Sequence, residues 1–524
     1  MKVALVQCPV WGTREPPLGL VQLSGCLKAF GIETKSFDLN NYLFRHRSES
    51  FDNLWAWEQS QFWYDRDSVE KFFVSVSATI DVFVDGVLGF SPNIIGFTVT
   101  ASTFASSVLI AGHLKQKNPD CLIVFGGQGF MDSRAVSRAF AEASIDYVVP
   151  ADGDSVFPEL VGIIERKGDV RECLGLYFRN AGSVAYSGDP VSRTSLDSLA
   201  YMDFTDLRVQ DYEDGRHLLM MASRGCVWHC AFCSSRAFGD KYRFMSGERI
   251  HQEIVYHKTT VSSDVRHIDF ADLAFNGNMD RVRTFCDLMV RYPPVPQESM
   301  SWLANAIIHP ELTLETLSRM AAAGCVRLIF GIESGSPALL KRMRKNYDPA
   351  IAVRVIKDAR TAGIHTTCNF MFGFPGETES DFEQTLDFLR AIASSVDRVY
   401  PSRTYCAMEE FSSFYAHPEE FGIKTPITHH LYWESVDGTN TYPVRLKRCQ
   451  RFELLCRELG VQVDSGVQTA VHRDEWFNLG HYYEYRREYG RALEYFYKYA
   501  AEDPCNAIVA RKIQEISAAG KAGV

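Results

Sequence analysis

The sequence predicts an α/β protein with an N-terminal doubly wound Rossmann-like domain, a partial TIM-like (β/α)6 barrel and a small α-helical C-terminal region. Three observations indicate this fold. Residues 1–195 alternate short apolar strands with amphipathic helices, and six further strand–helix units follow between residues 215 and 410. The tail, residues 471–524, has the apolar spacing of a helical hairpin.

Length and composition are those of a globular protein of about three domains. The chain has 524 residues, of which 46% are hydrophobic and 23% charged, and its formal net charge is −10. No Lys/Arg run stands out, so we expect no nucleic-acid partner. The uncharged stretch Ser91–Gly112 is rich in Ser, Thr and Gly, which favours a buried strand and a helix over a membrane span. The first residues lack the long apolar region of a signal peptide, and we expect a cytoplasmic protein.

The first domain, residues 1–195, is predicted to contain a parallel sheet. Helical patterns such as Leu18–Phe30 and Thr103–Gln116 separate its strands. The five predicted strands are Val3–Gln7, Glu33–Asp38, Ile94–Thr100, Cys121–Phe125 and Asp146–Val149. Ligands of doubly wound sheets bind at the carboxyl ends of the strands.

Three glycine-containing loops follow strands of this sheet. They are Pro16–Gly19, Gly126–Phe130 and Ala151–Asp154. Because glycine lets a large ligand approach the backbone closely, these loops are candidates for a ligand site. The alternative is that they are ordinary turns between a strand and a helix, and the residues alone do not decide between the two.

An aromatic-rich insert, Phe51–Tyr64, lies between the second and third strands. It suits either a cover for a flat cofactor or a satellite core. We favour the core.

Residues 196–214 are predicted to be a linker, and a second series of strands begins after them. The predicted strands are His217–Ser223, Val265–Asp272, Met300–Ala306, Val326–Glu333, His365–Phe372 and Arg398–Tyr405. Consecutive βα units of this kind build a TIM-like barrel, here residues 215–410. Functional residues of such a barrel collect at the C-terminal ends of its strands.

The remaining C-terminal residues divide into two segments. Residues 411–470 carry no motif that we can interpret, and we expect them to cover the mouth of the barrel. Residues 471–524 are similar to a tetratricopeptide repeat, with Trp476, Leu479, Gly480 and Tyr483 on one helix and Ala492 and Phe496 on the next. Since a stable solenoid needs about three repeats, we expect this single hairpin to pack on the barrel. A docking surface for a protein partner is the alternative.

Three of the 14 cysteines cluster directly after the first predicted barrel strand. Cys226, Cys230 and Cys233 have the spacing Cys-x3-Cys-x2-Cys. Three thiolates on one loop can bind three irons of a 4Fe–4S cluster and leave the fourth iron open. Zinc is the main alternative, but His229 adjoins Cys230 and would strain a closed four-ligand site, and no second cysteine pair follows at zinc-finger spacing. The pattern therefore predicts an iron–sulfur cluster.

This cysteine loop resembles that of the radical S-adenosylmethionine (SAM) superfamily. In that family the open iron binds SAM, and an electron from the cluster splits SAM into methionine and a 5′-deoxyadenosyl radical. The resemblance implies that Phe232 packs near the adenine and that Glu333 accepts hydrogen bonds from the ribose. The alternatives are a helix-capping acid at position 333 and an ordinary turn at positions 373–375. The SAM-binding residues implied together are Phe232, Gly331, Glu333, Ser334, Gly373, Phe374 and Pro375.

The resemblance is incomplete in two barrel strands. Asp272 stands where relatives often carry paired acids, but Ala271 replaces the second acid. Relatives often have an arginine near Asn305, where this chain has Ala306. We therefore assign no SAM or substrate contact to these two strands.

The domain before the barrel resembles the cobalamin-binding domain of cobalamin-dependent radical SAM enzymes. The three glycine loops match that class in combination, and residues 152–154 are a variant of its usual Gly-Glu-Gly-Glu element. The cobalamin contacts that the resemblance implies are Pro17, Leu18, Gly19, Thr98, Thr100, Ser102, Gly126, Gly127, Gly129, Phe130, Asp152 and Gly153.

The sequence lacks the Asp-x-His-x-x-Gly motif whose histidine ligates cobalt in cobalamin-dependent mutases and methionine synthase. His113 lies in a helical pattern. We therefore expect cobalamin to bind without a histidine from that motif, with Thr98, Thr100 or Ser102 near the lower face of cobalt. A vacant lower face would favour transfer of the methyl group as a radical.

Together these resemblances imply a methylase that abstracts hydrogen from an unactivated carbon and transfers a methyl group from methylcobalamin. The alternatives are a radical SAM enzyme for ring formation or rearrangement, and a non-catalytic partner-binding protein, against which the intact cysteines argue. The expected cofactors are a 4Fe–4S cluster, SAM and cobalamin. The expected partners are a small-molecule or natural-product substrate and an electron donor such as flavodoxin or ferredoxin. The sequence assigns neither the substrate nor a further catalytic residue.

Overall fold

The computed structural model describes residues 1–56, 59–150, 152–180, 182–190, 195–234, 241–261, 264–294, 300–402, 405–464, 471–504 and 506–522. The chain forms two compact units. The first contains Met1–Gly225, Ala237–Asn305 and Ala322–Cys325, and the second contains Cys226–Arg236, Ala306–Ala321 and Val326–Val524.

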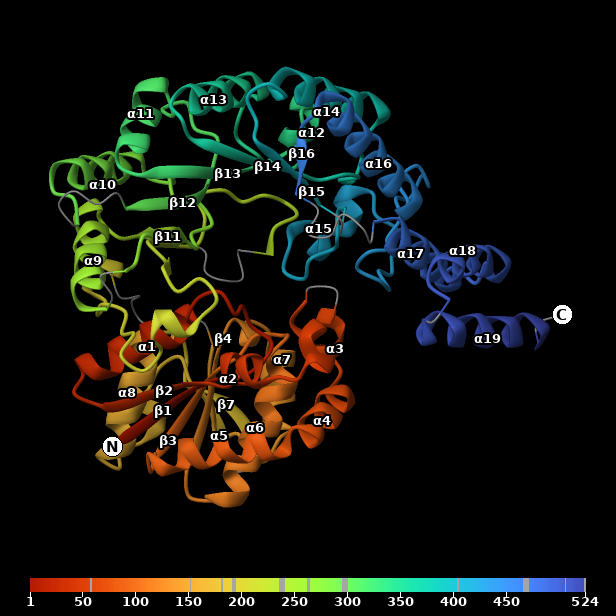
Figure 1. Cartoon of the computed structure of the whole chain (residues 1–524). Helices are drawn as coiled ribbons and strands as arrows, with labels where there is room; N and C mark the ends of the chain where they lie inside the picture. The colour runs from red at the N-terminus through yellow and green to blue at the C-terminus, as the bar shows by residue number, and fades with distance from the viewer. Residues whose placement is uncertain are drawn as a thin grey trace. The chain divides into compact units, whose positions relative to one another are not determined.

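The N-terminal part of the first unit contains a seven-stranded sheet in the order β2-β1-β3-β4-β5-β6-β7 (Figure 1). The strands are β1 (Lys2–Gln7), β2 (Glu33–Asp38), β3 (Ile94–Thr98), β4 (Leu122–Gly127), β5 (Tyr147–Pro150), β6 (Tyr177–Asn180) and β7 (Ser183–Tyr186). The first five are parallel, which confirms the predicted doubly wound sheet, and their order reverses between β1 and β3. The antiparallel hairpin β6–β7 at the edge was not predicted.

Helices pack on this sheet through its alternating apolar residues. Ala4, Val6, Ile95 and Phe97 share one core with residues of the helices between β2 and β5. Helix α1 (Leu18–Ala29) contacts β1, β2 and α8 (Gly153–Glu165). The other helices are α2 (Leu39–His46), α3 (Ser60–Tyr64), α4 (Arg66–Ser75), α5 (Ser77–Gly89), α6 (Phe104–Lys117) and α7 (Ser133–Phe140), with short 3-10 turns η1 (Glu49–Trp55), η3 (Gln128–Phe130) and η4 (Val170–Glu172).

The aromatic insert belongs to the main core of this part of the unit. Trp63 is fully buried, and its ring lies 5.6 Å from that of Trp55 and 5.7 Å from that of Phe72. The insert therefore stabilises the sheet domain, as the core interpretation predicted. Trp57 lies outside the described residues.

The predicted linker, residues 196–214, packs along α1 and β2. It contains the 3-10 turns η5 (Leu196–Ser198) and η6 (Val209–Asp211). Asp203 accepts hydrogen bonds from Ser24 and Lys28 of α1, and the Tyr212 hydroxyl donates to Asp38 at 2.8 Å. Residues 196–214 are therefore packed against α1 and β2.

The first unit also contains the start of the second βα series. Its strands are β8 (His217–Met220), β9 (Ser223–Arg224), β10 (Arg243–Phe244), β11 (His267–Phe270) and β12 (Ser301–Ala306), and its helices are α9 (Gly247–Thr260) and α10 (Met279–Arg291). Strands β8, β11 and β12 lie parallel in that order, whereas β9 and β10 form an antiparallel pair.

The second unit continues the series with the parallel strands β13 (Cys325–Glu333), β14 (His365–Phe370), β15 (Arg398–Pro401) and β16 (Gln462–Val463), in that order. The helices are α11 (Leu314–Ala322), α12 (Pro337–Arg342), α13 (Pro349–Thr361), α14 (Glu379–Ile392), α15 (Ser413–Ala416) and α16 (Tyr442–Leu459), with the 3-10 turn η8 (Pro418–Phe421). The βα alternation confirms the predicted fold class. Strand β16, within residues 411–470, adds to the six strands that the sequence indicated.

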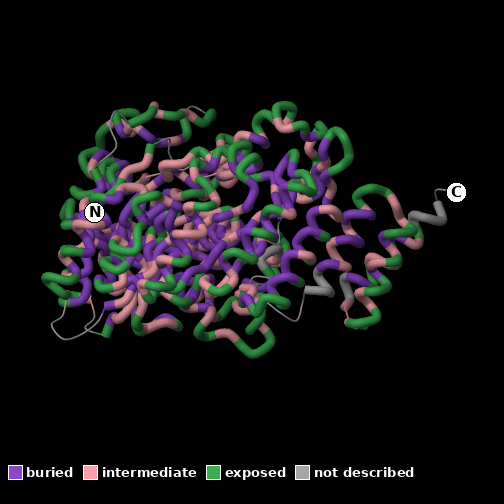
Figure 2. The backbone as a smooth tube through the Cα atoms, turned by 90° about the horizontal axis from the view of Figure 1, so that it is seen from above, coloured by how far each residue is buried: buried purple, intermediate pink, exposed green. Residues whose placement is uncertain are grey.

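Three helices end the chain: α17 (Val471–Tyr485), α18 (Tyr489–Glu502) and α19 (Ala507–Ala522). The predicted hairpin is formed by α17 and α18, and a Cβ on Gly480 would lie 2.7 Å from the Phe496 ring. Figure 2 shows that these helices carry both buried and exposed residues. Helix α19, which contacts α18, was not predicted.

The apolar helices are short or bent compared with a membrane span. Among the described residues no single helix is both long and apolar enough to cross a bilayer. The helices Arg66–Ser75 and Ser77–Gly89 together have the length and composition of a span, but they are bent by 89°. The uncharged stretch Ser91–Gly112 forms β3 and part of α6, as expected.

Candidate functional site

The cysteine loop, residues 226–234, is anchored in a small core of the second unit. Ala231 is buried with Met343 and Phe374, and its backbone N–H donates to the Met343 carbonyl at 2.9 Å. The Phe414 N–H donates in turn to the Ala231 carbonyl. Because Ala231 lies between Cys230 and Cys233, this anchor holds the loop while its cysteine side chains stay half-buried.

The three thiols fit a cluster better than one metal ion. Around one zinc ion, Zn–S bonds of about 2.3 Å would bring the thiolates to about 3.8 Å from one another. Among the described residues, only Glu15, His217 and Asp269 bring three His, Cys or carboxylate ligand atoms within 4.8 Å of one another. Cys226, Cys230 and Cys233 are therefore spaced more widely, as ligands of three separate irons would be.

Burial changes the pKa of two of these thiols, Cys226 and Cys230. It raises the pKa of Cys230 to about 12 and also raises that of Cys226, while the positive charge of Lys345 opposes both shifts. Metal ligation requires thiolates, so binding of iron would displace the protons.

Lys345 links the cysteine loop to the end of β13. Its Nζ lies 3.1 Å from Glu333 Oε1 and donates to the Gly331 carbonyl. The same ammonium lies 5.4 Å from the ring centre of Trp228 and 5.9 Å from that of Phe232. The sequence prediction missed Lys345, which lies twelve residues after Glu333 and belongs to no motif recognised in the sequence.

Glu333 has a strained backbone. Its φ is +65°, in the left-handed region that non-glycine residues rarely adopt, and the register of β13 with β14 shifts between Gly331 and Glu333. A Cβ on Gly331 would lie 2.7 Å from Glu333 Oε1. Such strain is maintained where a side chain must be aimed, and here it aims a carboxylate at the end of a strand.

Ser334, next to Glu333, is fully buried. Its hydroxyl lies 3.0 Å from the Thr385 hydroxyl, and the Gly335 N–H also donates to Thr385. The Ser334 side chain is thus committed to α14, and any contact of this residue with SAM would come from its backbone.

The turn at residues 373–377 follows β14 and is held from behind. Gly373 has φ +78°, and a Cβ there would lie 2.1 Å from Arg445 Cγ. Glu377 accepts the Gly373 N–H and the Arg448 guanidinium, the latter at 2.7 Å. Phe374 is fully buried, and its ring meets that of Phe232 edge-on at 6.4 Å.

Besides Arg448, the side chains of Asn440 and Arg445 hold the turn at residues 373–377. Asn440 Nδ2 donates to the carbonyls of Gly373 and Phe374 at 2.9 and 3.4 Å. Arg445 is almost fully buried and donates to Asn440 Oδ1 and to the carbonyls of Leu431 and Trp433. Sequence reasoning missed this role because residues 440–448 carry no motif, and their partners lie about 70 residues away in the chain.

Asp272 supports the approach to the cysteine loop within the first unit. It is fully buried, accepts the Ala222 N–H at 2.9 Å and the Ser223 hydroxyl, and lies 3.3 Å from Arg281. The Asn305 side chain donates to the Asp272 carbonyl at 3.1 Å. These contacts give both residues a packing role.

In the sheet domain, several residues predicted to contact cobalamin lie together at the carboxyl ends of β1, β3 and β4. A Cβ on Gly19 would lie 3.2 Å from Thr98 Cγ2. Gly127 has φ +100°, and a Cβ on Gly129 would lie 2.9 Å from the Val99 carbonyl oxygen. Pro17 precedes α1, Leu18 begins it, Gly126 and Gly127 end β4, and the buried Phe130 ends η3.

Thr100 and Ser102 follow β3 at the point where the strand order reverses. The two hydroxyls lie 3.1 Å apart, and Ser102 donates to the Val10 carbonyl at 3.3 Å. Ligands of doubly wound sheets bind at this reversal.

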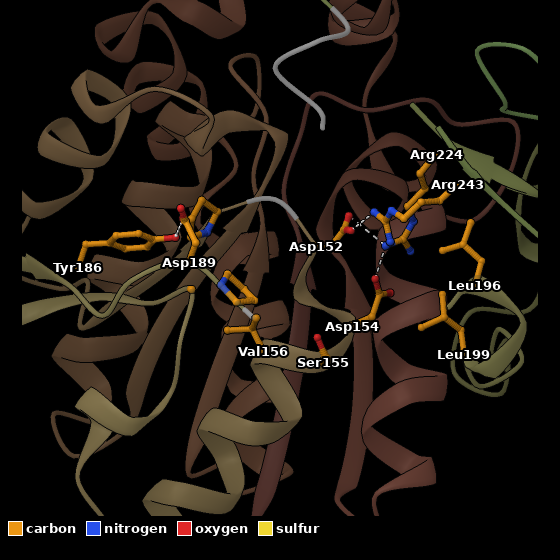
Figure 3. A pocket seen from close by; sticks show the side chains of 13 residues that line it. Asp152, Asp154, Ser155, Val156, Tyr186, Asp189, Leu196, Leu199, Arg224 and Arg243 are labelled. Atoms are coloured by element: carbon orange, nitrogen blue, oxygen red, sulfur yellow. Dashed lines mark hydrogen bonds and ion pairs between the residues drawn. The ribbon is translucent and has the colours of Figure 1, made fainter. Parts of the chain in front are cut away.

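Asp152, which follows β5, forms ion pairs with two arginines of the same unit. Asp152 lies 3.0 Å from Arg224 and pairs with Arg243, while Asp154 also pairs with Arg224. Figure 3 shows both carboxylates pointing toward the two guanidinium groups, at a pocket that Tyr186 and Asp189 also line. The Asp152 carboxylate is therefore engaged by arginines, and Gly153 begins α8.

A family comparison places this site among known proteins. Residues 220–389 match the model of the radical SAM superfamily. The match includes the cysteine loop, Glu333 and the turn at residues 373–377. The chain therefore contains a radical SAM domain.

Curated relatives of this radical SAM protein have several different activities. It is 29% identical over 309 residues to an uncharacterized methyltransferase of Pyrococcus horikoshii. The matched region covers 58% of this chain and 65% of the relative. It is 24% identical over 308 residues to the anaerobic magnesium-protoporphyrin IX monomethyl ester cyclase of Synechocystis, with 58% and 60% covered. The chain thus spans less than two thirds of the length of either relative.

Solved structures share the fold of this radical SAM protein over most of its length. The radical SAM methyltransferase TsrM from Kitasatospora setae, with tryptophan and a SAM analogue bound, has a TM-score of 0.61 and 17% identity, with 90% of each chain covered. The cobalamin-dependent radical enzyme OxsB, with aqua-cobalamin and SAM bound, has a TM-score of 0.57 and 16% identity, with 98% of this chain and 70% of that chain covered. At these identities the likeness concerns the fold alone.

Proposed function

We propose that this protein is a cobalamin-dependent radical SAM enzyme, a methylase that transfers a methyl group to an unactivated carbon of a small molecule or natural product. The observation that carries the proposal is the cysteine loop beside Glu333: three half-buried thiols and a strained strand-end carboxylate, joined by Lys345. A bound 4Fe–4S cluster and SAM would supply a 5′-deoxyadenosyl radical, and bound cobalamin would supply the methyl group.

The residues of the second unit would bind and orient SAM. Cys226, Cys230 and Cys233 would hold three irons. The Glu333 carboxylate can accept two hydroxyl hydrogen bonds, and its ion pair with Lys345 at 3.1 Å fixes its direction. Phe232 and the backbone of Gly373, Phe374 and Pro375 would enclose the adenine, because the apolar core behind them excludes water.

The glycine turns of the sheet domain would bind cobalamin through their backbone. At Gly19, Gly127 and Gly129 a Cβ would lie 2.9–3.2 Å from Thr98 or Val99, so these glycines let the loops pack tightly at the end of β3, where their backbone would line the cobalamin site. Thr98, Thr100 and Ser102 would stand near the lower face of cobalt. Methyl transfer is favoured over other radical reactions by the likeness to the Pyrococcus methyltransferase and by the fold shared with TsrM.

The test uses the anaerobically reconstituted full chain with methyl-labelled SAM and cobalamin. We expect labelled methylcobalamin and labelled product in the presence of an extract or a panel of candidate small molecules. The matched control is the Cys230→Ala chain under the same conditions. Absence of both labelled species from the reconstituted wild-type chain would contradict the methylase.

A ring-forming radical reaction is the second candidate, and the similarity to the Synechocystis cyclase supports it. It would give 5′-deoxyadenosine and methionine from SAM without label in the product. A non-catalytic partner-binding role would give neither, and the reconstituted chain would also lack the absorbance near 400 nm of an iron–sulfur cluster.

We further propose a cytoplasmic location, where reducing conditions keep the thiols available for cluster assembly. A small electron-transfer protein such as flavodoxin or ferredoxin would reduce the cluster. The helical hairpin α17–α18 is the surface we would test for a protein partner, by pull-down with and without residues 471–524.

A further inference from the structure

A second group of ligand-type side chains lies in the first unit. Glu15 belongs to the loop after β1, His217 begins β8, and Asp269 lies in β11. The parallel register pairs His217 with His267 and Leu219 with Asp269, so the two strands bring these polar residues to neighbouring positions. None of its three residues is among those assigned above to the cluster, SAM or cobalamin, although Glu15 is two residues before Pro17.

The loop that carries Glu15 is held against the approach to β8. The Glu213 N–H donates to the Thr13 carbonyl at 3.2 Å, and the Asp214 N–H donates to the Arg14 carbonyl at 3.1 Å. The Thr13 hydroxyl also donates to the Glu213 carboxylate. Glu15 is thereby brought to β8 although about 200 residues separate them in the chain.

The ligand atoms of the group converge. One such atom each from Glu15, His217 and Asp269 lies within 4.8 Å of the other two. Metal–ligand bonds of about 2.0–2.2 Å would place ligands about 3–4 Å apart, so small side-chain movements would complete the geometry. Glu15 Oε1, His217 Nδ1 and Asp269 Oδ1 are all buried, and none makes a hydrogen bond of acceptable geometry to the described residues.

His267 lies beside this group and orients it. Its Nε2 lies 2.8 Å from Asp269 Oδ1, and its Nδ1 lies 2.7 Å from the Ser301 hydroxyl. The rings of His217 and His267 lie 4.8 Å apart. An imidazole this close to a carboxylate can hold it in place beside a metal ion, as outer partners do in metal sites.

The charges of the group favour a cation. The carboxylates of Glu15 and Asp269 approach each other closely, and Asp214 Oδ2 lies 3.7 Å from His217 Nδ1. The Arg14 guanidinium pairs with Asp214 and also attracts Glu15 and Asp269, and His267 lies 2.8 Å from Asp269. The two neighbouring carboxylates still repel each other, and a proton or a cation between them relieves that repulsion.

We propose that Glu15, His217 and Asp269 bind one divalent first-row transition-metal ion, of the class of Mn²⁺ or Zn²⁺. One imidazole and two carboxylates suit such ions better than Ca²⁺ or Mg²⁺, which prefer oxygen ligands alone. The ion joins the loop after β1 to β8 and β11. Because Glu15 is two residues before Pro17, the ion also stiffens the loop that begins α1.

Mn²⁺ is the probe for the test, because thiolates bind it weakly and the cysteine loop therefore does not compete. The full chain, purified anaerobically with its cluster, is titrated with MnCl2 while free Mn²⁺ is followed by its electron paramagnetic resonance signal. We expect one Mn²⁺ per chain for the wild type. Glu15→Gln and Asp269→Asn should each weaken binding by at least about tenfold, as expected for loss of a charged ligand.

Asp280→Asn is the matched control, because Asp280 is an exposed acid of α10 in the same unit, and it should bind Mn²⁺ as the wild type does. Mn²⁺ should also raise the melting temperature of the wild type and of this control, but not that of the two ligand variants. Absence of stoichiometric binding by the wild type at millimolar Mn²⁺ would overturn the proposal. Equal Mn²⁺ binding by all four proteins would also overturn it. So would a gain in stability of the two ligand variants together with no effect of Mn²⁺ on the wild type, because a proton shared by the two acids would then explain their closeness. Absorbance near 400 nm, measured in the same samples, reports the iron–sulfur site separately.

Discussion

The cysteine loop and the turn at residues 373–377 belong to one unit but present opposite kinds of group. The cysteine loop presents side chains, and its backbone is anchored through Ala231. The turn presents backbone, and the side chains of Asn440, Arg445 and Arg448 hold it from behind. A site of the first kind depends on the side chains of its residues, whereas a site of the second kind depends on glycines, which have no side chain.

The glycine turn at residues 126–130 in the sheet domain is of the second kind. Gly127 adopts a positive φ, and Gly129 lies against the Val99 carbonyl. Substitutions should therefore act differently in the two kinds of site: loss of a ligand atom in one, and added volume in the other.

The largest effect is expected for Cys230→Ala. Removing one of three thiolates should lower the iron content of the reconstituted chain from about four atoms to nearly none. Iron analysis and absorbance near 400 nm measure this. Cys121→Ala, which removes a buried thiol of the sheet domain, should retain the iron. Retention of a full cluster in the Cys230 variant would refute the ligand assignment.

Gly373→Ala should be the most disruptive glycine substitution. The new Cβ would lie 2.1 Å from Arg445 Cγ, and φ would stay at +78°. Strain and overpacking together should cost about 3 kcal/mol of stability. Gly422→Ala is the control, with φ +65° but nothing within 4 Å, and should cost only about 1 kcal/mol. Equal melting temperatures for the two variants would show that the turn does not depend on its support.

Gly129→Ala tests the backbone site of the sheet domain. A Cβ 2.9 Å from the Val99 carbonyl must push the turn away from β3, and cobalamin affinity should fall about tenfold or more. Equilibrium dialysis with hydroxocobalamin measures the affinity. Gly112→Ala, in helix α6 with open space around it, should bind as the wild type does. A normal affinity for the Gly129 variant would count against cobalamin at this turn.

Lys345→Met should alter the cysteine loop without removing a ligand. Loss of a positive charge beside the cluster stabilises its oxidised form, so the reduction potential should become more negative by tens of millivolts. A redox titration of the reconstituted chain measures it. Lys341→Met, an exposed lysine of α12, is the control and should leave the potential unchanged.

The smallest effect concerns pH. Burial raises the pKa of Glu377 from its ordinary value of 4.5 to about 7, although Arg448 opposes the shift. Between pH 4.5 and 7 the folded chain therefore binds more protons at this group than the unfolded chain. Its contribution to the free energy of unfolding falls as pH rises through that range and is level above it.

Glu377→Gln lacks this proton exchange. Urea unfolding at several pH values should show the variant gaining stability relative to the wild type as pH rises from 5 to 7, whatever the constant cost of the lost ion pair. Glu383→Gln, an acid that pairs with Arg451 at the surface, should show no such trend. A stability difference independent of pH would mean that Glu377 stays ionised throughout.

Much of the fold was predictable because its signals are local. Strand patterns separated by amphipathic helices predicted β1 to β5 closely. The hairpin β6–β7 was missed because most of its residues are exposed, and β16 was missed because a two-residue strand has no periodicity. The segment predicted as a linker proved packed, since its polar residues meet partners on α1 and β2 rather than solvent.

The candidate site was predictable only in part. The cysteines, Glu333 and the glycine turns are recognisable because each depends on residue type at short spacing. Lys345, Asn440, Arg445 and Arg448 are ordinary polar residues, and their roles arise from where the chain brings them.

The sequence by itself determined three thiols at fixed spacing, a carboxylate at the end of a strand, and glycines in the turns that follow strands. The tertiary structure alone decided which cation lies beside the thiols, which side chains hold the turn at residue 373, and that Glu15, His217 and Asp269 converge. The physical reason is the distance along the chain over which each property arises. Bonding capacity and backbone freedom belong to single residues and their neighbours, whereas a shared charge, a buried hydrogen bond or a group of ligand atoms exists only after distant segments have packed together.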